Sequence, residues 1–184
     1  MFRTIRLIAL LVTLALAATP LAGLAQEPLT EPYTSSDGLS FSYPAGWVAV
    51  DRYGVVMLSN EEGTLEADVI PPGGIGVILV GPQTLRAVLP LEDMGLMDVA
   101  VTMAEGFALE GVEPGSLVLV AMTIGDWPAV RLDFGTEEGD GVILAMDHGD
   151  GEILVVVGAT APGEMGQFEA TVLAIAATVA YAPP

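Results

Sequence analysis

The single histidine of the chain is the side chain best suited to acid–base chemistry near neutral pH. His148 lies in the segment Asp147-His148-Gly149-Asp150-Gly151, whose composition predicts a turn between two strands. A Ser-His-Asp triad would need this residue, but Ser40 and Ser42 fall in a predicted strand, and the chain has no Gly-x-Ser-x-Gly segment. We therefore expect His148 to be a solvated loop residue, and we predict neither histidine-based catalysis nor a multi-histidine metal site.

Carboxylates are the other candidate chemical groups, and they concentrate in two predicted loops. One loop contains Glu137, Glu138 and Asp140, and the other contains Asp147, Asp150 and Glu152. Calcium prefers six to eight oxygen ligands, but neither loop has the 12-residue EF-hand spacing. The loops should lie at opposite ends of the strand 142–146, roughly 15–20 Å apart, so they cannot pool ligands. Solvated turns are the expectation; a calcium-stabilised domain and a two-carboxylate hydrolase stay open as alternatives.

Two further patterns invite a binding-site interpretation. Gly73-Gly74-Ile75-Gly76 is rich in glycine, but a phosphate loop needs a helix after it, whereas an apolar strand follows here and the chain has no lysine. We predict no cofactor site. The aromatic residues near turns could line a ligand groove, but such positions favour capping of the core. They are Tyr43, Trp47, Tyr53 and Trp127.

Composition narrows the class of protein. The chain has 184 residues, 52% of them apolar, and no cysteine, which excludes a disulfide-stapled protein and a cysteine-ligated zinc site. Its hydrophobicity argues against a disordered chain. Its formal net charge of −19 disfavours nucleic acid as a partner, because the chain would repel phosphate.

The N-terminal residues 1–25 have the pattern of a secretory signal peptide. Arg3 and Arg6 precede an uncharged run over 7–18 that is too short to span a bilayer, and small residues precede a cleavage site between Ala25 and Gln26. We expect an extracytoplasmic protein without a stable membrane anchor after cleavage; an uncleaved anchor is the alternative. Residues 26–36 contain two prolines and no periodicity, which predicts a flexible leader.

Hydrophobic periodicity predicts the elements that position these groups. Period-2 alternation or apolar runs between turn residues indicate strands near 39–43, 47–50, 55–58, 75–80, 117–123, 130–134, 142–146 and 153–159. Spacing of three to four residues predicts helices over 91–108 and after Pro162. The predicted class is α+β, with one mainly antiparallel sheet covered by helices on both faces, an α/β/α sandwich.

The opening strand and turn resemble those of the PsbP-like superfamily. The resemblance is carried by Phe41-Ser42-Tyr43-Pro44 with Gly46-Trp47, by Gly125 with Pro128-Ala129-Val130-Arg131, and by the closing helix with Phe168, Ile175 and Thr178. It covers roughly residues 33–182 and implies a single PsbP-like domain over 37–182. Members of this superfamily are binding or assembly proteins, so the resemblance implies no catalytic set. We expect a secreted, non-enzymatic protein whose partner is another protein or a small ligand.

Overall fold

The computed structural model describes residues 27–67, 69–106 and 117–183. The predicted signal peptide and its cleavage site at Ala25 and Gln26 lie outside the described residues, as does the end of the helix expected over 91–108. The strands are β1 (Leu29–Thr34), β2 (Leu39–Pro44), β3 (Val48–Arg52), β4 (Val55–Ser59), β5 (Ile75–Val80), β6 (Val118–Ile124), β7 (Trp127–Gly135), β8 (Asp140–Asp147), β9 (Ile153–Thr160) and β10 (Ala180–Tyr181). The α-helices are α1 (Pro82–Val88), α2 (Leu96–Gly106) and α3 (Met165–Thr178), with 3-10 turns at Thr64–Glu66 and Leu91–Asp93.

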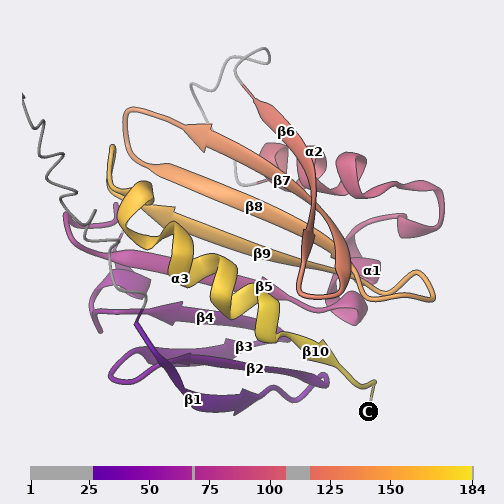
Figure 1. Cartoon of the computed structure of the whole chain (residues 1–184), viewed down its shortest axis with the longest axis horizontal. Coiled ribbons are helices and arrows are strands. Elements are labelled where there is room, and N and C mark those ends of the chain that lie inside the picture. Colours follow the sequence, from indigo (N-terminus) through magenta and orange to yellow (C-terminus); the bar gives the residue numbers. More distant parts are fainter. Residues whose placement is uncertain (1–26, 68, 107–116, 184) are drawn as a thin grey trace, which may run out of the picture.

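The predicted α+β class is confirmed, with a seven-stranded antiparallel sheet and three α-helices (Figure 1). The order β3-β4-β5-β9-β8-β7-β6 contains the predicted meander, because β6 to β9 are consecutive antiparallel neighbours. The expected single sheet is wrong, however. The opening strand β2 belongs to a separate three-stranded sheet with β1 and β10.

The predicted flexible leader over 26–36 is also wrong over most of its length, because β1 pairs with β2. Tyr33 stacks on Phe41 with ring centroids 5.3 Å apart, and Leu29 packs against the core. The stacked pair of Tyr33 and Phe41 helps to hold β1 against β2, a contact that the composition of residues 26–36 did not indicate. Pro32 is tolerated because β1 is an edge strand.

Two clusters of buried side chains use alternate residues of the large sheet. Val142 and Leu144 of β8 lie in the cluster to which α3 contributes, and Ile143 and Ala145 lie in the cluster to which α1 and α2 contribute. Figure 1 shows α3 crossing the sheet on the side that faces the viewer. Gly158 of β9 allows this close packing, because a Cβ atom there would lie 2.9 Å from Val172 of α3.

The helix expected over 91–108 begins later than predicted. Leu91–Asp93 is a 3-10 turn, and α2 begins at Leu96 after Gly95. The Gly95 N–H donates to an Asp98 carboxylate oxygen at 3.0 Å, which is one of the two hydrogen bonds of a capping box and marks the helix start. No helix was predicted at the position of α1. Its signature is Pro82 in the first helical turn, where a proline costs no backbone hydrogen bond.

Candidate functional site

The turn between β8 and β9 is compact and internally hydrogen-bonded. Asp147 Oδ1 accepts from the Gly149 N–H at 2.8 Å, and the Glu152 N–H donates to the Gly149 carbonyl at 2.9 Å. Asp150 has φ +54°, a left-handed conformation that aspartate tolerates better than most residues. The turn therefore presents the side chains of His148, Asp150 and Glu152 in a fixed arrangement at one end of the large sheet.

His148 is not the solvated loop residue that the sequence analysis predicted. Its ring stacks on Trp127, with centroids 4.2 Å apart and an interplanar angle of 21°. Burial lowers the pKa of His148 below its ordinary value of 6.5, and the nearby Asp147 charge opposes this only in part. Nε2 is buried and has no hydrogen-bond partner in the described part of the chain. The imidazole is therefore neutral near pH 7 and keeps one unused polar atom.

Antiparallel pairing of β7 with β8 explains why these two rings meet. Ala129 pairs with Met146, and continuing this register by two residues brings Trp127 opposite His148. Neither segment taken alone indicates this contact. Counting the register of the predicted hairpin back from its loop would have revealed their proximity.

An ion pair borders the same turn. Arg86, in the last turn of α1, lies 2.9 Å from Glu152 Oε1, and its side chain is about half exposed. The hydrogen bond to Glu152 raises the pKa of Arg86. The other carboxylate oxygen, Glu152 Oε2, is buried with no hydrogen-bond partner among the described residues. Glu152 thus has one satisfied and one free acceptor.

Two hollows flank this turn. The smaller hollow has a volume of about 340 Å³, and the larger has about 790 Å³. Asp150 borders both, whereas Glu152 faces the smaller and Arg86 the larger. The smaller hollow is lined by Trp127, His148, Gly149, Asp150, Glu152, Ala180, Tyr181 and Pro183. Aromatic, aliphatic and acidic surfaces therefore meet in one depression.

The C-terminal residues form one wall of the smaller hollow. β10 pairs with β2, so that Tyr181 lies opposite Leu39. Burial raises the pKa of Tyr181 above 10.0, and the negative charges of Glu152 and Asp37 add to this effect. Asp37 itself is buried and bonded to Ser35, and its Oδ2 has no partner in the described structure. The electrostatic environment at this end of the sheet is negative.

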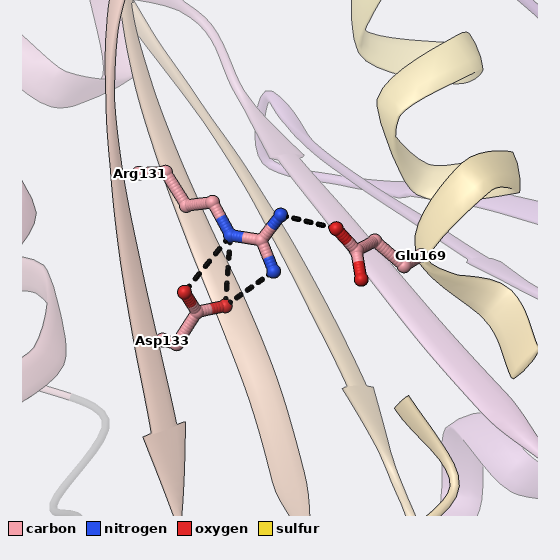
Figure 2. Close-up of polar contacts among 3 residues, drawn as sticks. All are labelled: Arg131, Asp133 and Glu169. Atoms are coloured by element: carbon pink, nitrogen blue, oxygen red, sulfur yellow. Dashed lines mark hydrogen bonds and ion pairs between the residues drawn. The ribbon is translucent and has the colours of Figure 1, made fainter. Parts of the chain in front are cut away.

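A second polar cluster links β7 to α3 (Figure 2). Arg131 donates from Nε and Nη2 to Asp133 on the same strand, at 2.7–2.9 Å, and from Nη1 to Glu169 of α3. These bonds, those to Asp133 first, raise the pKa of Arg131. Since the guanidinium is shared between two carboxylates and only 19% of its side chain is exposed, this cluster fits a structural contact better than a ligand site.

The remaining candidates from the sequence do not converge on a site. Ser42 bonds to Thr178, and neither Ser40 nor Ser42 is among the described residues that line the hollow beside His148. The glycine segment 73–76 leads into β5, as predicted. Trp47 is buried in the core, as predicted for a core cap, whereas Tyr53 is fully exposed.

The two acidic loops lie at opposite ends of β8, as the sequence predicted. In the loop at the other end, Asp140 accepts from the Gly163 backbone N–H at 2.6 Å, and the Thr136 N–H donates to the Gly139 carbonyl. Within the described ranges, no group of three or more histidine, cysteine, aspartate or glutamate side chains is placed to hold a metal ion. None of the helices described is long and apolar enough to cross a membrane.

Comparison with known proteins identifies the fold. No family model and no curated protein matches the chain. The solution structure of cyanobacterial PsbP (CyanoP) from Synechocystis sp. PCC 6803 is 19% identical, with a TM-score of 0.50 over 83% of this chain and 92% of that chain. A crystal structure from Bacteroides thetaiotaomicron VPI-5482 (16% identity, TM-score 0.45) covers 84% of this chain and 49% of its own. The crystal structure of a Pseudomonas aeruginosa protein of unknown function is 14% identical, with a TM-score of 0.45, over 85% of this chain and 100% of that chain. The order of elements and the similarity to cyanobacterial PsbP show that the chain has a PsbP-like fold.

Proposed function

We propose that the chain is an extracytoplasmic, non-enzymatic binding protein whose ligand occupies the depression beside the turn between β8 and β9. One observation carries this proposal. The only histidine, one of the two tryptophans and the half-satisfied carboxylate of Glu152 gather around a hollow of about 340 Å³. Concave sites with apolar walls and a few unsatisfied polar atoms are the usual form of small-ligand sites.

The lining of the smaller hollow supports binding over catalysis. Its described residues include no serine, threonine or cysteine that His148 could activate as a nucleophile. A carboxylate-dependent hydrolase is the second candidate, because Asp150 and Glu152 border the same hollow and Glu152 Oε2 is buried without a partner. The two candidates differ in one property, which is turnover of the bound molecule.

The proposal includes the finer organisation of the chain. The signal peptide over 1–25 would deliver a single domain, predicted over 37–182 and extended toward the N-terminus by β1, to the cell exterior or envelope. We infer that helices and the small sheet together cover both faces of the large sheet as a sandwich, since alternate β8 residues enter clusters with α3 and with α2. Val118 and Val120 on the edge strand β6 are 58% and 45% exposed, so neither the helices nor the small sheet cover these residues. Mass spectrometry of exported protein should find Gln26 at its N-terminus.

The binding proposal is tested with a panel of small cations, neutral molecules and anions. Ligands that raise the melting temperature of the protein are then tested on Trp127→Leu, and Glu138→Leu at the opposite end of β8 is the control. The expected result is stabilisation that is lost in Trp127→Leu and kept in the control. A bound compound that is converted to product, with turnover abolished in Glu152→Gln, would establish the hydrolase instead. Stabilisation equal in all variants would overturn the proposed site.

A further inference from the structure

We infer that the smaller hollow binds an organic cation, an alkylammonium group with at least one N–H, held between the Trp127 ring and the Glu152 carboxylate. This inference rests on the proposed binding function and adds the chemical class of the ligand. Its support comes from the charge of the hollow, the nature of its walls and the polar atoms left without partners.

The negative charge of the smaller hollow favours a positively charged ligand. Asp150 and Glu152 face the smaller hollow, and its described lining contains no arginine. Arg86 pairs with Glu152 from the side of the larger hollow and leaves Oε2 free. The whole chain, these residues included, has a formal net charge of −19. An anionic ligand would meet repulsion at short and at long range, whereas a cation would be attracted at both.

The walls favour an organic cation over a metal ion. Calcium needs six to eight oxygens, but most of the described lining is aromatic or aliphatic. A volume of about 340 Å³ is at the low end for small-molecule sites and far exceeds the volume of a bare ion. Trp127 also lines the hollow with an indole, the ring that attracts cations best among the side chains, and His148 covers one of its two faces. An ammonium group with an attached apolar chain satisfies all three conditions.

Two acceptor atoms without hydrogen-bond partners favour a cation that carries an N–H donor. Glu152 Oε2 is a buried acceptor with no bond in the described structure, and leaving such an oxygen unsatisfied costs free energy. The Glu152 side chain is 27% exposed, so a rotation that turns Oε2 into the hollow would let an ammonium N–H supply the missing donor. His148 Nε2, which is also buried without a partner in the described structure, can accept a second N–H when the imidazole is neutral and its ring tilts toward the hollow. Quaternary ammonium ions lack this donor, so the hollow should prefer protonated amines.

The test uses three probes that differ mainly in charge: butylammonium, 1-butanol and butyrate. The chain has two tryptophans, so the indole N–H signals in an NMR titration of 15N-labelled exported protein are two in number, and Trp127→Phe assigns them. Butylammonium should shift the Trp127 signal saturably and leave that of the buried Trp47 in place. We expect binding of 1-butanol and butyrate to be at least about tenfold weaker, a difference of ~1.4 kcal/mol. Tetramethylammonium, a fourth compound that has the charge but no N–H, should be weaker by the same factor.

Two variants test the carboxylates. Glu152→Gln should weaken butylammonium binding at least tenfold, and Glu138→Gln, at the far end of β8, should leave it unchanged. Because Glu152→Gln also disturbs Arg86, Asp150→Asn is the second variant. It removes a charge from the same hollow while the Arg86–Glu152 pair stays intact, and asparagine tolerates the left-handed backbone at this position. We expect a threefold or larger loss of affinity for Asp150→Asn.

The outcomes separate this inference from the proposed function. If 1-butanol or butyrate shifts the Trp127 signal as strongly as butylammonium does, the hollow is a ligand site but the cationic class is wrong. If Glu152→Gln and Asp150→Asn bind butylammonium like the unmodified protein, the ammonium ion is not held by these carboxylates, and the inference fails. If no compound of any charge binds at the turn, the inference and the proposed function both fail.

Discussion

At the scale of single residues, His148 links stability to pH. Its pKa in the folded protein lies below 6.5 because stacking against Trp127 buries the ring, and Asp147 offsets this only in part. Tyr181, Asp150 and Glu152 line the same hollow. As the pH falls below 6.5, the unfolded chain binds a proton that the folded chain still excludes, so the free energy of unfolding decreases until the pH has passed the folded pKa.

His148→Phe keeps an aromatic stack but cannot bind a proton. We therefore expect its loss of stability between pH 7.5 and 5 to be smaller than that of the unmodified protein, as measured by urea denaturation at each pH. Other titrating groups contribute equally to both proteins and cancel in the comparison. A larger loss in His148→Phe would mean that the folded state binds the proton more tightly, contrary to the buried, neutral ring.

Trp47 and Trp127 provide a second prediction at this scale. Trp47 is 8% exposed in the core, and its Nε1–H donates to Glu27 at 3.2 Å. Trp47→Ala should cost about 3–5 kcal/mol, since it removes a large apolar contact and leaves a cavity. Trp127→Ala should cost less, about 1–2 kcal/mol, because the ring is part-exposed and loses mainly its stack with His148. Chemical denaturation of both variants gives the comparison, and equal midpoints would contradict the assignment of Trp47 to the core.

At the scale of elements, Arg131 connects the sheet to the last helix. Replacement by methionine removes the shared guanidinium and leaves Asp133 and Glu169 without their common partner. We expect a loss of about 1–2 kcal/mol, more than a solvent-exposed pair contributes and less than a fully buried one. The loss should shrink at high salt, where partly exposed charges are screened.

Arg52→Met is the matched control for this prediction. Arg52 is exposed at the end of β3 and makes no ion pair within the described residues. Its replacement should change stability by less than about 0.5 kcal/mol. If both variants have the same denaturation midpoint as the unmodified protein, the contact between β7 and α3 contributes nothing measurable.

Strands joined by short loops were predicted well from the sequence, whereas contacts between distant segments were not. Apolar runs between turn residues predicted β5 at its observed bounds and the meander from β6 to β9, because pairing of consecutive strands is local. The pairing of β10 with β2 joins residues about 140 positions apart, and periodicity carries no information on such contacts. The same holds for the site. His148 was recognised as a candidate from its type, but its burial against Trp127 depends on register between strands, which no single segment encodes.

At the scale of the whole molecule, excess negative charge is the dominant feature. The chain has 24 acidic residues against five basic ones, and self-repulsion of this kind lowers the stability of the compact state. Sodium chloride should raise the melting temperature by screening. A dedicated calcium site would raise the melting temperature further in calcium than in other salts, because an ion that binds only the folded state stabilises it by mass action.

We expect millimolar calcium to raise the melting temperature no more than magnesium does at the same ionic strength. The two acidic loops lie at opposite ends of β8, and their described carboxylates form no group of three or more ligands. Calcium needs six to eight oxygens, so scattered carboxylates can only attract it weakly. Differential scanning calorimetry in matched calcium, magnesium and sodium chloride series measures the difference. A calcium-selective rise of about 10 °C would correspond to more than 1 kcal/mol of specific binding and would establish the calcium-stabilised domain that screening alone does not require.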